Sequence, residues 1–199
     1  MNEQKRAIRQ EIRRREQNLS VKYKQDASRR IANFICNSRM YQKARVISCF
    51  VGTRREIDTR LILNRVLENP NKRLCVPLCI NHQNQSGVME MREIFNFNQL
   101  SPGMMGILEP DCNQTNAIPP DQIDLFILPC LSCDIKTGRR LGYGGGYYDK
   151  YLNNLNYLNK FHGELILLCR EKLLSQEIPL ESHDILIPRI LTERGFYIL

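Results

Sequence analysis

The sequence lacks long apolar runs and contains few histidines. None of its stretches approaches the roughly 20 apolar residues that a membrane-spanning helix needs. The N-terminal run MNEQKRAIRQEIRRREQ has no apolar segment of the kind found in secretory signal peptides. We therefore expect a cytoplasmic protein without a membrane partner. The three histidines, His82, His162 and His183, show no helical metal-ligand spacing, which disfavours a histidine metal site.

Paired zinc-binding cysteine motifs are also missing, although eight cysteines are present. Cys130 and Cys133 form a C-x2-C pair, half of a common zinc site, but no second pair accompanies it. Cys75 and Cys79 fall in an expected strand, which would hold them about 13 Å apart, too far to share one ion. We expect no structural zinc, and free thiols typical of a reducing compartment. Four cysteines occur in apolar runs, where thiols pack as small hydrophobic groups: Cys36, Cys49, Cys75 and Cys169.

The positive charge is concentrated near the N-terminus. The 199-residue chain has a net charge of +8, from 29 Lys and Arg against 21 Asp and Glu. Residues 1–30 hold ten basic and four acidic residues, and so contribute +6 of that charge. A local basic excess suits a nucleic acid or an anionic small molecule equally well. A solvated helix face explains most of these side chains in either case.

Helical and strand patterns alternate along the chain. Apolar periodicity predicts helices over residues 3–18, from a Ser20 cap through Ile35, over 58–68 and over 147–158. Short apolar, β-branched runs predict strands at 45–51, 73–80, 88–94, 124–129, 163–169 and 185–191. Residues 100–120 are rich in Pro, Gly and Asn and are expected to form a loop, and residues 81–87 a hairpin-like connection. With no linker or repeat, we expect one three-layer α/β domain over residues 1–199, its mostly parallel sheet covered by helices on both faces.

A glycine-rich loop is the strongest functional signal. Gly142, Gly144, Gly145 and Gly146 lie between an expected strand and an expected helix. Such a loop presents free N–H groups and a helix N-terminus to an anion, and Arg139 and Arg140 border it. The loop has no G-K-[ST] ending and only loosely fits G-x-G-x-x-G, so it is neither common nucleotide motif. An ordinary flexible loop is the alternative to phosphate binding.

Other candidates are isolated residues. Glu56 follows the 45–51 strand, at the end where α/β sheets bind ligands, and could grip a ring rich in N–H groups or be a turn residue. Asp149 could hold a phosphate-bound Mg2+ or favour the helix N-terminus. Asp184 could be a metal ligand or a turn former, and His183 beside it is interpreted as structural. Three tyrosines could stack on a planar ring or pack the loop: Tyr143, Tyr147 and Tyr148.

The glycine loop and three further segments resemble a known family. R-L-G-Y-G-G-G-Y-Y-D (140–149), preceded by D-L-F-I-L-P (124–129), is similar to the signature of the 5-formyltetrahydrofolate cyclo-ligases, also called 5,10-methenyltetrahydrofolate synthetases. K-R-A-I-R (5–9), E-I-D-T (56–59) and H-D (183–184) before T-E (192–193) occur in the family's order. The resemblance implies an α/β enzyme that uses ATP and Mg2+ to close 5-formyltetrahydrofolate to 5,10-methenyltetrahydrofolate, with release of ADP and phosphate.

The resemblance also implies roles for individual residues. Arg140 and Tyr148 correspond to catalytic residues, and Asp149 and Asp184 to Mg2+ ligands. The folate would contact Arg9, Val51, Glu56 and Tyr148. The residues expected to bind ATP are Lys5, Arg6, Arg9, Arg140, Leu141, Gly142, Tyr143, Gly144, Gly145, Gly146, Tyr147 and Tyr148.

Two positions depart from the family pattern. Cys130 stands where relatives commonly have glycine, and Cys133 where they have an aromatic residue, so either the backbone differs at 130 or the position tolerates a side chain. We expect activity as a monomer on a small-molecule folate, without nucleic acid. The alternative is a basic RNA-binding or phosphate-sensing protein without turnover. Tyr23 is the one aromatic residue within the basic segment, whereas RNA binding by stacking needs several. A catalytically silent folate-storing relative is a third reading, for which the sequence offers no sign.

Overall fold

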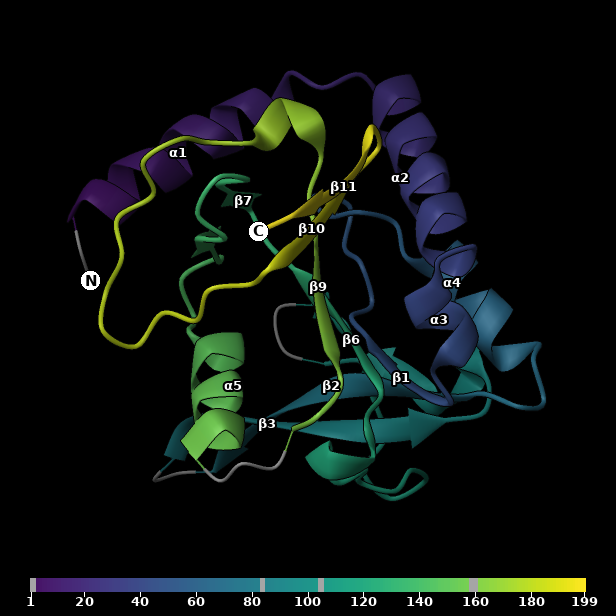
Figure 1. Ribbon diagram of the computed structural model, residues 1–199. Helices are drawn as coiled ribbons and strands as arrows, with labels where there is room; N and C mark the ends of the chain where they lie inside the picture. Colours follow the sequence, from purple (N-terminus) through teal and green to yellow (C-terminus); the bar gives the residue numbers. More distant parts are fainter. Residues whose placement is uncertain (1–2, 83–84, 104–105, 158–160) are drawn as a thin grey trace.

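A seven-stranded sheet organises the fold (Figure 1). The computed structural model describes residues 3–82, 85–103, 106–157 and 161–199. The strand order is β11-β10-β9-β6-β1-β2-β3, in which β10, β9, β6, β1 and β2 are parallel and the two edge strands are antiparallel to their neighbours. The strands are β1 (Val46–Cys49), β2 (Arg73–His82), β3 (Gln85–Ile94), β6 (Leu125–Pro129), β9 (Glu164–Leu168), β10 (Arg189–Thr192) and β11 (Gly195–Ile198). The expectation of a mostly parallel α/β sheet is confirmed.

The helices begin where the sequence offers caps. The Ser20 hydroxyl accepts a hydrogen bond from the Tyr23 N–H at 3.2 Å, and Ser38 does the same for Tyr41 at 3.2 Å. Each serine satisfies one N–H that a helix start leaves without an intrahelical partner. The helices are α1 (Glu3–Gln17), α2 (Val21–Cys36), α3 (Arg39–Lys43), α4 (Arg60–Leu67) and α5 (Tyr147–Tyr157). The five-residue α3 was not predicted, because it is too short to show an apolar period.

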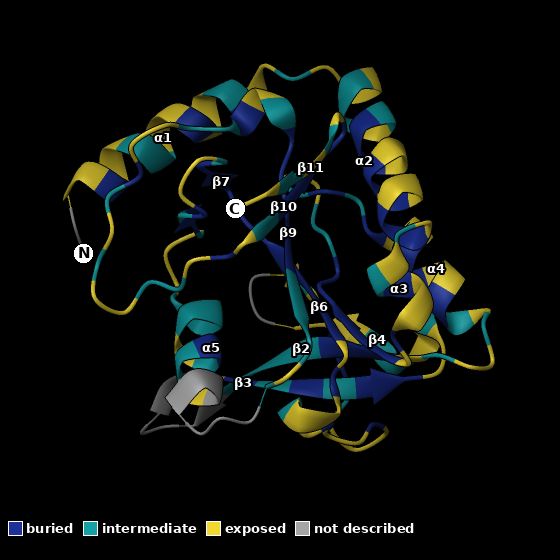
Figure 2. Cartoon of the chain, viewed as in Figure 1, coloured by how far each residue is buried: buried dark blue, intermediate teal, exposed yellow. Residues whose placement is uncertain are grey.

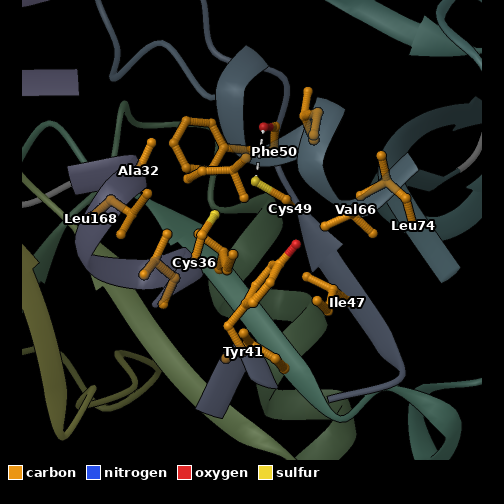
Figure 3. Packing of buried hydrophobic residues seen from close by; sticks show 14 of the residues in the cluster. Ala32, Cys36, Tyr41, Ile47, Cys49, Phe50, Val66, Leu74 and Leu168 are labelled. Carbon is orange, nitrogen blue, oxygen red and sulfur yellow. Dashed lines mark hydrogen bonds between the residues drawn. The ribbon is translucent and has the colours of Figure 1, made fainter. Parts of the chain in front are cut away.

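Helices cover both faces of the sheet. On one face, Ile31 of α2 and Ile62 of α4 pack with Ile47 of β1 in a cluster that also includes α3 (Figure 3). On the other face, Ile12 of α1 and Leu152 of α5 pack in a second cluster. The strand residues of this cluster are those whose side chains point to that face of the sheet. Figure 2 shows the central strands buried between these helices. The three-layer expectation is therefore confirmed.

Four cysteines pack inside these clusters as expected. Cys36 and Cys49 lie among the aliphatic side chains of the first cluster, as Figure 3 shows, and Cys75 and Cys169 lie in the second. All four are buried free thiols. Thiols in such surroundings behave as small apolar groups.

Two parts of the sequence expectation were wrong. The 100–120 segment is not all loop, because β4 (Leu100–Pro102) and β5 (Leu108–Pro110) form a small antiparallel pair within it. The closing strand begins at residue 189 rather than 185, and β11 follows it as an unexpected edge strand. Runs of three or four residues are too short for a reliable alternating pattern. The 81–87 connection is also shorter than expected, since β2 and β3 extend into it, and residues 83–84 lie outside the described chain.

The strand order places a ligand site at one edge of the sheet. From β1 the chain moves outward to β2, whereas from β6 it moves in the opposite direction to β9. Open α/β sheets bind ligands beyond the carboxyl ends of the strands at such a switch point. The segment with Glu56 follows β1, and the glycine loop follows β6. Across the described residues, no helix has the length and apolar character to cross a membrane.

Candidate active site

A small β-hairpin presents the glycine loop. It pairs β7 (Ser132–Cys133) with β8 (Arg140–Leu141) immediately after β6. Asp134 closes the turn between them by accepting hydrogen bonds from the Lys136 N–H at 2.8 Å and the Thr137 hydroxyl at 2.7 Å. Gly138 completes the turn with a φ of 73°. The hairpin therefore fixes where the loop starts.

The loop backbone needs its glycines. Gly144 has a φ of 114° and Gly146 a φ of 67°, conformations that side-chain-bearing residues rarely adopt. A Cβ at Gly145 would lie 2.9 Å from the Tyr147 ring. The chain then enters α5 at Tyr147. As the glycine pattern predicts, the loop opens onto a helix N-terminus, where N–H groups favour an anion.

Helix α1 docks against this loop through arginines. The Arg9 Nε donates to the Gly142 carbonyl at 2.9 Å, and Arg13 Nη2 donates to the Tyr143 carbonyl at 3.4 Å. The Arg9 Nη1 is buried and has no hydrogen-bond partner in the described part of the chain. Burial lowers the pKa of Arg9, and the charge of Arg13 lowers it further. The sequence analysis missed Arg13, although its spacing of four residues from Arg9 was a readable signal.

Lys5 lies deeper than the other cations of α1. Its side chain is buried and its Nζ donates to Glu181 at 2.7 Å and to Asp184 at 2.5 Å. Arg6, the next residue, is exposed. Lys5 thus holds the acidic 181–184 segment against α1. Figure 1 shows the chain before β10 running beside α1.

Arg140 links the hairpin to the start of α5. Its guanidinium is buried and donates to Asp149 at 2.6 Å and to the Pro129 carbonyl at 3.3 Å. The same group lies over the Tyr148 ring, 5.7 Å from its centroid. The Arg140 Nε is buried without a hydrogen-bond partner among the described residues. These contacts place Arg140 and Tyr148 together, as the resemblance implies.

Glu56 faces the same region from the loop after β1. Its Oε2 accepts a hydrogen bond from the Thr53 N–H at 3.0 Å, and Val51 is buried beside this turn. Burial raises the pKa of Tyr148, and the negative charge of Glu56 raises it further. The charge of Glu56 therefore acts on Tyr148, although the two residues are far apart in sequence.

Arg170 is a second residue that the sequence analysis missed. It follows β9, is 3% exposed, and donates from Nη1 to the Arg55 carbonyl at 2.8 Å and from Nη2 to the Glu56 carbonyl. Its two bonds hold the backbone that carries the Glu56 carboxylate. A single arginine after an apolar run gives no signal for this role, because the contact depends on two loops that meet only in the fold.

Carboxylates gather where the resemblance implies Mg2+. Asp184, Glu181 and His183 offer ligand atoms within 4.8 Å of one another. Asp149 lies nearby, since Asn153 donates both to the Asp149 carbonyl at 2.9 Å and to the His183 carbonyl. Oxygen donors of this kind suit Mg2+. Asp149 already pairs with Arg140 and Asp184 with Lys5, so a cation here competes with two side-chain cations.

Three buried thiols adjoin the hairpin. Cys130 and Cys133 precede the loop, and Cys169 comes from the end of β9. Hydrogen bonds from the other two thiols lower the pKa of Cys169 to about 5, and the Arg170 charge acts in the same direction. Cys130 does not adopt a positive φ, since Glu177 is the non-glycine residue that does within the described ranges. The backbone therefore accommodates a side chain where relatives have glycine.

Known proteins are similar to this chain in sequence and in fold. Residues 1–193 match the model of the 5-formyltetrahydrofolate cyclo-ligase family. The chain is 28% identical to the 5-formyltetrahydrofolate cyclo-ligase of Haemophilus influenzae, over 93% of this chain and 96% of that one. It is 26% identical to the Mus musculus protein of that name, over 97% and 95%. In fold it is similar to the NMR structure of Aquifex aeolicus 5,10-methenyltetrahydrofolate synthetase, with a TM-score of 0.79 and 21% identity over 98% of this chain and 92% of that one.

Proposed function

The chain belongs to the 5-formyltetrahydrofolate cyclo-ligase family, and on this premise we propose that it converts 5-formyltetrahydrofolate to 5,10-methenyltetrahydrofolate with ATP. One observation supports the assignment. The glycine loop, contacted by Arg9 and preceded by Arg140, and the loop that carries Glu56 both follow the carboxyl ends of central strands, at the switch point of the sheet. The two halves of the site match a phosphate donor and an N–H-rich ring.

ATP would bind with its phosphates over the glycine loop. The loop N–H groups and the start of α5 face this position, and the unpartnered Arg9 Nη1 adds a buried donor. Arg140 provides a second guanidinium with an unpartnered Nε. Lys5 would act indirectly, by holding the carboxylates of Glu181 and Asp184 in place. The exposed Arg6 would add positive charge at the edge of the nucleotide site. This arrangement supports the assignment of residues 140–148 and α1 to the nucleotide.

The folate ring would lie between Glu56 and Tyr148. A carboxylate can accept two parallel hydrogen bonds from adjacent ring N–H groups, and a tyrosine face can stack on the ring. Val51 provides a buried apolar wall, and Arg170 fixes the Glu56 backbone. The ring then extends toward Arg9 and the glycine loop, so that the formyl oxygen approaches the ATP phosphates.

The proposed chemistry is phosphoryl transfer followed by ring closure. The formyl oxygen attacks the γ-phosphorus, ADP leaves, and the oxygen becomes a phosphate ester. The second folate nitrogen then attacks the activated formyl carbon and releases its proton to solvent, and the C–O bond breaks as phosphate departs. Such a reaction depends on positioning and charge neutralisation more than on a protein nucleophile. Arg140 is placed to stabilise charge on the transferred group, and Tyr148 to orient the folate.

We assign Mg2+ to Asp149 and Asp184 because their oxygen donors fit this ion and flank the phosphate position. When bound, Mg2+ would neutralise phosphate charge. Before it binds, Arg140 and Lys5 balance the two carboxylates. These two ion pairs therefore allow Asp149 and Asp184 to lie in the folded site without a bound metal ion.

The RNA-binding alternative gains no support from α1. Lys5 is buried in ion pairs, Arg9 contacts Gly142, and Arg14 pairs with Glu11. Arg15 donates to the carbonyls of Leu174 and Lys172. Much of the basic charge therefore serves internal contacts. Because every proposed site residue comes from one chain, we propose that a monomer suffices.

Two separate binding titrations test this assignment. Calorimetry with ATP and with 5-formyltetrahydrofolate should each show one site per chain. ATP binding without folate binding would remove the substrate assignment and leave the nucleotide loop intact. A short RNA that bound tightly, with steep salt dependence, would instead favour the alternative.

A further inference from the structure

The three thiols beside the glycine hairpin form a compact sulfur cluster. The Sγ atoms of Cys130, Cys133 and Cys169 all lie within 4.8 Å of one another. All three residues are buried, with exposures of 9%, 0% and 2%. This cluster lies outside the residues assigned to ATP and folate.

The sheet register explains how the cluster assembles. In the parallel pairing of β6 and β9, Pro129 lies opposite Leu168, so the next residues along the two strands, Cys130 and Cys169, come level. The hairpin then returns Cys133 toward them. The sequence shows the C-x2-C pair but not its partner, because the third sulfur joins only when the strands align. No second C-x2-C pair is present, as the sequence shows, and Cys169 joins Cys130 and Cys133 as a single third sulfur.

The sulfur spacing fits a shared metal ion. Thiolate sulfurs bind borderline and soft ions at about 2.3 Å, which separates three sulfurs in a trigonal plane by about 4.0 Å. Three sulfurs that all lie within 4.8 Å of one another are compatible with this separation.

The number of ligands favours a soft monovalent ion over zinc. Within the described ranges, no fourth histidine, cysteine or carboxylate joins the group. Structural zinc sites nearly always use four protein ligands. Thiolates without a hard donor select soft ions such as Cu+, which also accepts three-coordinate sulfur sites.

A nearby buried cation offsets part of the charge of such a site. Arg170, adjacent in sequence to Cys169, contacts backbone carbonyls, and within the described chain it forms no ion pair and leaves Nε unpartnered. A buried guanidinium without a carboxylate partner is otherwise costly. Three thiolates and one Cu+ leave two negative charges, of which Arg170 offsets one.

We propose that Cys130, Cys133 and Cys169 bind one soft monovalent metal ion, Cu+, through three thiolate sulfurs. Binding replaces the thiol protons, which pass to solvent, and forms three metal–sulfur bonds. No electrons are transferred, because the ion enters and remains as Cu+. The site is separate from the oxygen-donor group that includes Asp184.

A competition titration tests the proposal. Reduced protein carrying Cys112→Ala, which removes an exposed thiol, is titrated anaerobically with Cu+ against a chromophoric Cu+ chelator. We expect one Cu+ per chain, and at least tenfold weaker binding in the Cys130→Ala, Cys133→Ala and Cys169→Ala variants. Cys75→Ala removes a buried thiol outside the cluster and should retain the wild-type affinity. Circular dichroism and thermal melts verify that each variant folds.

X-ray absorption of the copper-loaded protein provides an independent readout, and three sulfur neighbours are expected. Failure of the folded protein to compete with the chelator would overturn the proposal. Equal loss of binding in Cys75→Ala would also overturn it, as would two sulfur neighbours or a shell containing oxygen. A site that took Zn2+ with the same variant pattern and resisted Cu+ would contradict the choice of ion. A Cys130–Cys133 disulfide that persisted in reduced protein, seen by mass spectrometry, would exclude the three-thiolate site.

Discussion

Lys5 near the start of the chain donates to the Asp184 carboxylate at 2.5 Å, across a separation of 179 residues. This contact joins the first helix to the acidic segment that precedes β10, and both border the glycine loop. The cation and the acid that the family resemblance assigns to ATP and Mg2+ therefore hold each other in the structure described here. The site is charge-balanced before any ligand arrives.

Lys5→Met should destabilise the fold and weaken ATP binding. Removing the ammonium leaves the largely buried Asp184 carboxylate without its partner, at a cost of about 2 kcal/mol, below the range for a fully buried pair. Urea denaturation measures the loss. Arg14→Met, which breaks an exposed pair with Glu11, is the control and should leave the transition midpoint unchanged. An unchanged midpoint in Lys5→Met would contradict the role of this contact.

Glu56→Gln should weaken folate binding roughly 10- to 100-fold while ATP still binds. The substitution keeps the shape but replaces one acceptor oxygen with a donor, and a charge-assisted hydrogen bond is worth about 1.5–3 kcal/mol, or roughly 10- to 100-fold in affinity. Calorimetry with each ligand separates the two effects. Glu68→Gln alters an exposed carboxylate elsewhere and should change neither affinity. Wild-type folate affinity in Glu56→Gln would remove this residue from the site.

Gly144→Ala should weaken ATP binding about tenfold or more. At a φ of 114°, a side chain strains the backbone, so the loop N–H groups would leave their positions. Gly106→Ala provides a matched control, because Gly106 also has a positive φ, with open space around it, outside the glycine loop. We expect the control to bind ATP normally. Similar ATP affinities in the two variants would argue against a backbone cradle.

Arg170→Met should raise the KM for the folate about tenfold with little change in the KM for ATP. Arg170 is a positioning residue, since it holds the Arg55 and Glu56 carbonyls rather than touching the substrate position. Arg170→Lys keeps the charge and should restore part of the folate affinity. Steady-state kinetics with each substrate varied in turn provides the measurement. An equal rise in both KM values would indicate general disruption instead.

Thiol alkylation should show a wide spread of rates. Cys112 is exposed and should react first with iodoacetamide at pH 8. Burial raises the pKa of Cys79 to about 12, so its thiolate fraction, and with it the alkylation rate, should rise about tenfold per pH unit between pH 8 and 10. Peptide mass spectrometry over time follows each site. Rapid, pH-independent labelling of Cys79 would contradict the burial and the raised pKa of this thiol.

Local features of the site were predictable from the sequence, whereas its long-range contacts were not. The Ser20 cap and the positive φ values at Gly144 and Gly146 follow from residue type and position. Arg170 and Cys169 gave no functional signal, because each acts on residues brought together by the pairing of β6 with β9 or by the meeting of loops. The roles proposed for Glu56 and Tyr148 come from the family resemblance, because neither residue type alone predicts a ligand.

The short strands were not predicted from the sequence for a different reason. Three-residue strands such as β4 and β5 form because the chain folds back on itself between Leu100 and Pro110, and proline-rich composition there suggested a loop. Strand pairing overrode that local preference.

The most direct measurement is the ATP-dependent formation of methenyltetrahydrofolate. Purified protein is mixed with 5-formyltetrahydrofolate, ATP and Mg2+, and the near-ultraviolet absorbance of the product is followed, with reactions lacking ATP and with Glu56→Gln as controls. We predict a steady rise in absorbance with wild-type protein, which disappears without ATP and slows roughly tenfold or more with Glu56→Gln at limiting folate. No rise with folded protein that still binds ATP would contradict the proposed reaction.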